Sequence, residues 1–174
     1  MSQQLPPIER YESNTGIRIY RMPVEAFPGF IAYTCLLLGG EVPTLVDTGS
    51  NMDKSQQDLK AAIESVHDDF GESIRIEDIK RILITHGHID HHGGLNFARE
   101  LIPAEVGIHP LDRRILTAYE ERVIVATKNL RVYLQRAGVS SRSTANLMEM
   151  YGFAKRLLKS ERVDFLLEES SGEL

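Results

Sequence analysis

Residues 81–94 constrain the fold of this chain more than any other segment. The apolar run Ile82-Leu83-Ile84 predicts a buried strand. It leads directly into Thr-His-Gly-His-Ile-Asp-His-His-Gly-Gly, residues 85–94, which we call the histidine loop. Of the 6 histidines in the protein, four lie in this loop. We therefore expect several imidazoles and one carboxylate at the carboxyl end of a buried strand.

Strands and helices alternate along most of the chain, which predicts an α/β layered fold. The predicted strands are residues 17–21, 30–38, 43–46, 81–85, 105–108 and 163–167, and the predicted helices are 53–67, 93–101, 111–138 and 140–160. Strands 30–38 and 43–46 are expected to form a hairpin. Residues 1–15 are expected to be an extended lead-in, and residues 23–29 a loop.

The first predicted helix has a clear amphipathic pattern. Its apolar stripe consists of Leu59, Ala62, Ile63 and Val66. Asp53 or Ser55 is expected to cap its amino end, because both side chains can accept hydrogen bonds from free backbone N–H groups.

Two segments of the chain place polar side chains at the ends of predicted strands. Asp47 follows the strand 43–46, and His86 follows the strand 81–85. In α/β sheets, ligands gather beyond the carboxyl ends of the strands. We therefore expect Asp47 and the histidine loop to share one site.

The spacing within the histidine loop favours metal binding. In an extended segment, His86 and His88 project to the same side, and Asp90 repeats that spacing. His91 stands at the turn into the next helix and approaches from another direction. Imidazole and carboxylate ligands suit zinc, and also iron or manganese. The alternative is a polar loop whose histidines only cap or meet solvent.

The remaining residues of interest have two interpretations each. Asp47 is a candidate for orienting a metal-bound imidazole from outside the ligand shell. His92 can touch substrate or metal, or can be structural. His109 can lie beside the site or serve in a turn, and His67 is expected on the surface at a helix carboxyl end.

Composition excludes several classes of function. The formal net charge is -5 and no run of Lys or Arg stands out, which argues against nucleic acid as a partner. No apolar segment approaches the roughly 18 residues that cross a bilayer, and residues 1–10 lack the apolar core of a signal peptide. The single cysteine, Cys35, rules out an intrachain disulfide and favours a reducing, cytoplasmic setting.

The histidine loop resembles the T-H-x-H-x-D-H-x-G-G signature of the metallo-β-lactamase-fold hydrolases. Residues 45–49, Leu-Val-Asp-Thr-Gly, are similar to the L-I-D-T-G strand end of the same family. The resemblance covers about residues 16–110, and its motifs are specific for the superfamily but not for the substrate. It implies an αβ/βα sandwich that is built from two similar halves.

The same resemblance implies a ligand set for two metal ions. His86 and His88 would bind the first ion, Asp90 and His91 the second, and Asp47 would support the ligands. His88 stands where iron-based flavodiiron relatives carry a glutamate, so zinc is favoured.

The implied activity is that of glyoxalase II-like or lactonase-like enzymes. A hydroxide shared by two metal ions attacks a small-molecule ester, thioester or lactone, and Asp90 takes the proton. Serine and cysteine nucleophiles are not required.

The sequence departs from the family pattern after residue 110. No histidine follows His109, so the further ligands of a two-metal shell are not found. We expect the amino-terminal half of the domain at 16–110, a helical insertion or lid at 111–160, and a last strand and frayed tail at 161–174. The chain alone is then expected to bind metal weakly or partially and to have little activity.

Two interpretations of the chain follow. It is a hydrolase whose carboxyl-terminal ligands lie outside this sequence, or a non-catalytic metal-binding or interaction module that another chain completes. The region 111–160 can form a homo-oligomer contact. Its Met148, Met150, Tyr151 and Phe153 either line an apolar substrate wall or belong to ordinary helix packing or a dimer face.

Overall fold

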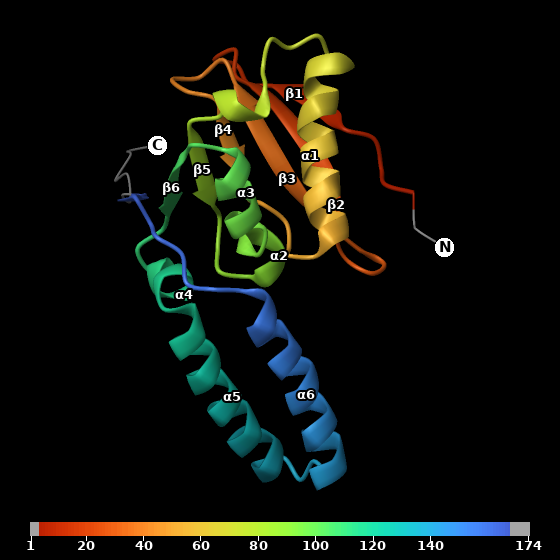
Figure 1. Ribbon diagram of the computed structural model, residues 1–174, viewed down its shortest axis with the longest axis vertical. Coiled ribbons are helices and arrows are strands. Elements are labelled where there is room, and N and C mark those ends of the chain that lie inside the picture. The colour runs from red at the N-terminus through yellow and green to blue at the C-terminus, as the bar shows by residue number, and fades with distance from the viewer. Residues whose placement is uncertain (1–3, 168–174) are drawn as a thin grey trace.

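The computed structural model describes residues 4–167, and the side chains of all of these except 150–157. Its centre is one mixed sheet, which carries helices on one face and a long helical pair beyond one edge (Figure 1). Seven strands lie in the sheet in the order of the chain. They are β1 (Glu9–Glu12), β2 (Arg18–Phe27), β3 (Phe30–Leu38), β4 (Thr44–Val46), β5 (Arg81–Ile84), β6 (Glu105–Ile108) and β7 (Phe165–Leu166).

The direction of the strands changes in the middle of the sheet. Strands β1 to β4 pair antiparallel, so the predicted hairpin of β3 and β4 is confirmed. From β4 to β7 the pairing is parallel. The carboxyl ends of β4, β5 and β6 therefore open at the same edge of the sheet.

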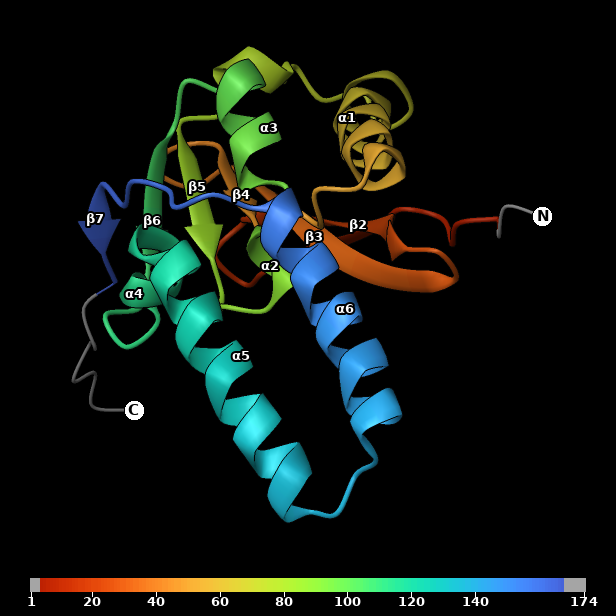
Figure 2. The ribbon, with the colours of Figure 1, turned by 60° about the horizontal axis from the view of Figure 1, so that its bottom comes forward.

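The helices follow the predicted order, with more breaks than the sequence suggested. They are α1 (Asp53–Asp68), the 3-10 turn η1 (Ile76–Asp78), α2 (Ile89–His92), α3 (Leu95–Leu101), α4 (Arg113–Thr117), α5 (Tyr119–Arg136) and α6 (Ser141–Leu157). Helices α1 and α3 cover one face of the sheet (Figures 1 and 2). None of the helices in the described part of the chain is long and apolar enough to cross a bilayer.

The core lies between the sheet and helices α1 and α3. The predicted stripe of α1 is confirmed, since Leu59, Ala62, Ile63 and Val66 are all buried. They face alternate residues of β2, because successive side chains of a strand point to opposite faces. Tyr20, Met22 and Val24 are fully buried on that face.

The prediction of a loop at residues 23–29 was wrong, because β2 continues through Phe27. Proline is tolerated in a strand only where its missing N–H faces no partner. β1 pairs with β2 only as far as Arg21, so Pro23 lies where β2 has become an edge on that side. On its other side, Pro23 still pairs with Tyr33 of β3.

Two further expectations need correction. The extended lead-in contains a true strand, β1, which joins the sheet beside β2. Neither Asp53 nor Ser55 caps α1: the N-cap residue is Met52, and it makes no side-chain cap bond. The Ser55 hydroxyl instead accepts a hydrogen bond from the backbone N–H of Ser50, which fixes the loop that leads from β4 to α1.

The helical pair α5 and α6 extends from the edge of the sheet where the parallel strands end (Figures 1 and 2). Ser140 caps α6 by accepting a hydrogen bond from the backbone N–H of Ser143. The chain then returns to the sheet, where β7 pairs with β6 and confirms the predicted last strand in a shorter form.

Candidate metal centre

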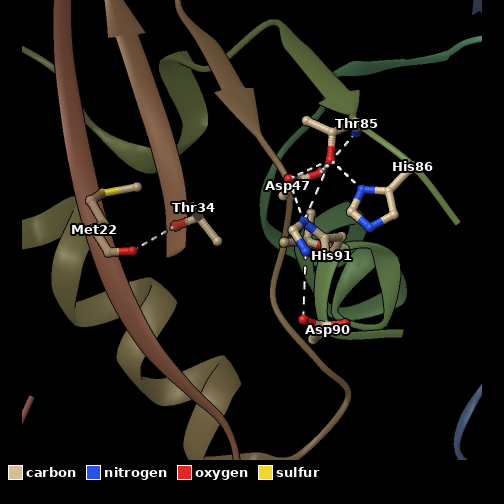
Figure 3. A network of polar contacts seen from close by, with 8 residues as sticks. Met22, Thr34, Asp47, Thr85, His86, Asp90 and His91 are labelled. Atoms are coloured by element: carbon tan, nitrogen blue, oxygen red, sulfur yellow. Dashed lines mark hydrogen bonds and ion pairs between the residues drawn. The ribbon is translucent and has the colours of Figure 1, made fainter. Parts of the chain in front are cut away.

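The candidate site lies where β4 and β5 end, and it joins Asp47 to the histidine loop (Figure 3). Asp47 directly follows β4, and its backbone N–H donates to Leu83 O of β5 at 2.8 Å. The φ of Asp47 is 61°, a left-handed conformation that aspartate adopts more readily than most residues. This turn directs a buried carboxylate toward the loop, so the predicted meeting of the two segments is found.

The histidine loop is extended only in its first half. His88 has φ -82° and ψ 144°, and α2 begins at the next residue. The expectation that Asp90 continues an extended spacing was therefore wrong, because Asp90 and His91 lie on a helical turn. Three imidazoles still converge: the ring centroid of His86 lies 4.5 Å from that of His88 and 4.1 Å from that of His91.

Hydrogen bonds to Asp47 set the tautomer of His91. Nδ1 of His91 lies 2.7 Å from Asp47 Oδ2. An ionised carboxylate only accepts hydrogen bonds, so Nδ1 of His91 carries the proton. The lone pair of a neutral ring then sits on Nε2, the form in which histidine binds a metal.

Thr85 links His86 to Asp47 and so fixes the tautomer of His86 as well. Its hydroxyl lies 2.8 Å from Asp47 Oδ2 and 3.0 Å from Nδ1 of His86. Because the hydroxyl proton is donated to Asp47, the hydroxyl oxygen accepts from Nδ1–H of His86. The backbone N–H of Thr85 also donates to Asp47, at 2.8 Å. His86 and His91 therefore both present Nε2 away from Asp47.

The carboxylate of Asp90 faces the free nitrogen of His91. Nε2 of His91 lies 3.5 Å from Asp90 Oδ2. The lone pair on Nε2 and the negatively charged carboxylate repel each other. A cation between them, or a second proton on the ring, would relieve this repulsion. Two donors about 2.0–2.2 Å from a tetrahedral zinc ion lie roughly 3.3–3.5 Å apart. The donor chemistry and this spacing fit a zinc-type ion.

The candidate metal ligands do not form a complete coordination shell. Within the part of the chain that the structure describes, no group of three or more His, Cys, Asp or Glu side chains is positioned to hold a metal ion. The pair of Asp90 and His91 is thus the best-defined element of the site, and His86 and His88 lie beside it.

Glycine allows the loop after β4 to lie directly against the histidine loop. A Cβ at Gly94 would lie 2.2 Å from Thr48 O, and one at Gly93 would lie 3.0 Å from the Cα of Ser50. The backbone N–H of Thr48 donates to His91 O at 2.7 Å, and that of Gly94 donates to Gly49 O at 3.0 Å. These contacts fix the helical turn that carries Asp90 and His91.

The last histidine of the loop, His92, is buried with only 5% of its surface exposed. Its ring packs edge-on against Tyr119, with centroids 5.9 Å apart. Burial lowers the pKa of His92 from 6.5 to about 4, although hydrogen bonding to backbone groups, including that of Gly87, opposes the shift. Of the two interpretations of His92, the structural one fits these contacts.

This burial predicts a pH dependence of stability in the metal-free chain. A histidine with a lowered pKa binds its proton more tightly in the unfolded chain, so stability falls as the pH drops from about 6.5 toward 4. Between pH 7 and pH 5 the wild type should lose about 2 kcal/mol more unfolding free energy than His92→Phe. Urea denaturation of both proteins at the two pH values measures this difference, and equal losses would contradict it.

The other two histidines, His67 and His109, lie outside the histidine loop. His67 lies in the last turn of α1, and its Nδ1 lies 2.7 Å from Glu72 O. Nδ1 of His109 accepts a hydrogen bond from the backbone N–H of Leu111, which fits the turn interpretation. Met148 is half-buried on α6. Met150, Tyr151 and Phe153 lie outside the residues whose side chains are described, so the proposed apolar wall stays a prediction.

Sequence reasoning missed two residues that contact the loop from the helical region. Ile115 of α4 packs on Gly87, and Tyr119 of α5 packs on His92. Both belong to an apolar helical pattern, which does not by itself indicate which surface they meet.

Comparison with known proteins identifies the family of the chain. A family model described as the metallo-beta-lactamase superfamily matches residues 28–169 and so includes the histidine loop and the helical pair. A search of curated proteins finds no significant match.

A solved structure with the same fold covers most of this chain, and two others match it over a shorter stretch. The metallo-beta-lactamase family protein TTHA1429 from Thermus thermophilus has a TM-score of 0.65 and 22% identity, over 88% of this chain and 46% of that one. The subclass B3 enzyme MEM-A1, isolated from a soil metagenome library, has a TM-score of 0.45 and 24% identity, over 57% of this chain and 33% of that one. Rm3 metallo-beta-lactamase has a TM-score of 0.44 and 27% identity, over 57% and 32%.

This chain spans less than half of the length of these three structures. The family match, in contrast, covers most of the chain. The chain belongs to the metallo-β-lactamase superfamily, whose fold is that of metal-dependent hydrolases.

Proposed function

We propose that the protein is a zinc-dependent hydrolase of a small ester, thioester or lactone. His86, His88, Asp90 and His91 would hold the metal, as two ions when the ligand shell is complete, and iron or manganese could replace zinc. The observation that carries the proposal is the pair of Asp90 and His91. Nε2 of His91 faces the carboxylate while Asp47 holds the opposite nitrogen of the ring.

Zinc, when bound, polarises a carbonyl oxygen and lowers the pKa of water, so that a nucleophile exists at neutral pH. The residues of the chain prepare the site for this chemistry. Asp47 and Thr85 fix the rings of His91 and His86 with Nε2 available. The Asp90 carboxylate would accept the proton of the attacking water. Its side chain is 18% exposed and that of His91 is 25% exposed, so a small substrate can reach both.

The charge of the protein supports the substrate class. A net charge of -5 without a basic run disfavours polyanionic substrates such as nucleic acid. We place the protein in the cytoplasm, where a single cysteine is stable without a disulfide partner. Self-association through the helical pair is also proposed, because α5 exposes Ile124, Val125, Val132 and Tyr133.

Removal of metal provides the test of this proposal. Treatment with a chelator should abolish hydrolysis of a panel of esters, thioesters and lactones, and added zinc should restore it. Asp90→Asn should lower kcat by about 100-fold or more, because the amide cannot accept the proton.

A matched control is Asp68→Asn, which alters a carboxylate with 73% exposure at the end of α1. This change should leave the rate as in the wild type. Hydrolysis that survives the chelator, or an Asp90→Asn variant as active as Asp68→Asn, would rule out the proposed function.

A further inference from the structure

The segment 113–119, which we call the helical base, contacts the histidine loop at Gly87. A Cβ built on Gly87 would lie 2.2 Å from Cδ1 of Ile115 and 2.8 Å from its Cγ2. The side chain of Ile115 therefore fills the space where the residue between His86 and His88 would carry its own side chain. Since Gly87 joins these two histidines, a shift of Ile115 would move the backbone that carries both.

The helical base reaches the other end of the loop through Tyr119. The Tyr119 ring packs edge-on against His92 at an interplanar angle of 66°. Both side chains are more than nine-tenths buried. Nε2 of His92 has no hydrogen-bond partner among the described residues. His92 directly follows His91, so a shift of His92 would also move the helical turn that carries His91.

The helical base is itself held by the returning segment of the chain. The backbone N–H of Tyr119 donates to the Ser160 hydroxyl at 2.9 Å. The backbone N–H of Ser160 donates to the Glu120 carboxylate at 3.0 Å. Glu161 N–H donates to Leu116 O at 2.8 Å. These three hydrogen bonds fix the helical base to residues 160–161.

We propose that the helical base sets the geometry of the histidine loop through its packing contacts, with Ile115, Tyr119 and His92 as positioning residues. Metal binding and the order of the base are then coupled. The metal-related part of this inference rests on the proposed function. The contacts themselves exist without metal, so coupling between base and loop can be measured in the metal-free chain.

The first test uses hydrogen exchange on the metal-free protein. Ile115→Ala removes the side chain that fills the space at Gly87. Leu134→Ala serves as the control, because Leu134 is a buried apolar residue of α5 away from the histidine loop. It lies 15 residues beyond Tyr119, about 22 Å along α5. We expect amides of residues 86–94 to exchange at least about 5-fold faster in Ile115→Ala than in Leu134→Ala, at similar melting temperatures.

The milder Ile115→Val change keeps the measurement possible if the alanine variant does not fold. It should give a smaller acceleration in the same amides. Equal exchange of residues 86–94 in the Ile115 and Leu134 variants would overturn the proposal.

The second test uses Co²⁺ as a spectroscopic probe of the ligand geometry. Ile115→Ala should weaken Co²⁺ binding about 10-fold and change the visible absorption bands, whereas Leu134→Ala should stay within about twofold of the wild type. Because coupling is reciprocal, Co²⁺ should also slow amide exchange in residues 113–119 of the wild type. Equal Co²⁺ affinities of the two variants would contradict the coupling. A wild type that binds no Co²⁺ would instead overturn the proposed function, and exchange in the metal-free protein then decides the inference alone.

Discussion

Gly94→Ala is expected to lower the free energy of unfolding by about 3 kcal/mol. The φ of Gly94 is -83°, so the backbone conformation itself accepts alanine. The cost comes from space, because the new Cβ would lie 2.2 Å from Thr48 O and 3.2 Å from Ser50 O. Both atoms are backbone and cannot rotate away. Urea denaturation of the metal-free protein measures the effect.

Gly40→Ala is the control for this change. Among the described residues, only Cδ1 of Ile17 would lie within 4 Å of its Cβ, at 4.0 Å, so the stability should change by less than about 0.5 kcal/mol. Equal stabilities of the two variants would show that the loop after β4 does not pack closely against the histidine loop.

Asp47→Asn is expected to weaken zinc binding by about 10- to 100-fold. Asparagine has nearly the same shape and also adopts a positive φ, so the turn after β4 should be retained. What changes is the hydrogen-bond acceptor. The Asp47 carboxylate accepts hydrogen bonds from Thr85 N–H, from the Thr85 hydroxyl and from Nδ1–H of His91. An amide offers one acceptor oxygen and places an N–H₂ group against the remaining donors.

Asp58→Asn provides the comparison. Asp58 is also buried and accepts a hydrogen bond from the backbone N–H of Glu25, but it lies on α1 outside the site. Competition with a chromophoric chelator gives the zinc affinity of each variant. Asp58→Asn should lose stability and keep its zinc affinity. A zinc affinity that falls equally in both variants would refute the specific role of Asp47.

The site could be located from the sequence because its parts are local. Asp47 and His86 each follow an apolar strand, and parallel strands bring their carboxyl ends to one edge. The convergence of Asp47 with the histidine loop follows from that rule. The helical position of Asp90 did not follow, because a short turn of four residues, α2, carries no periodic signal.

Two other differences arose from tertiary context. Pro23 suggested a loop, but it remains in β2 because its partner strand β1 has already ended. Ile115 and His92 had no distinguishing pattern, since their roles depend on contacts with Gly87 and Tyr119 that are distant in the sequence. Contacts of this kind are set by packing rather than by local preference.

The most direct measurement is zinc affinity across single changes in the histidine loop. Wild type, His86→Ala, His88→Ala and His91→Ala would be titrated beside His67→Ala, a histidine on α1 outside the loop. We predict that the wild type and His67→Ala bind zinc alike, and that each change in the loop removes most of the bound metal. Zinc binding that is unchanged in the three loop variants, or absent from the wild type, would contradict the assignment of the histidine loop as a metal site.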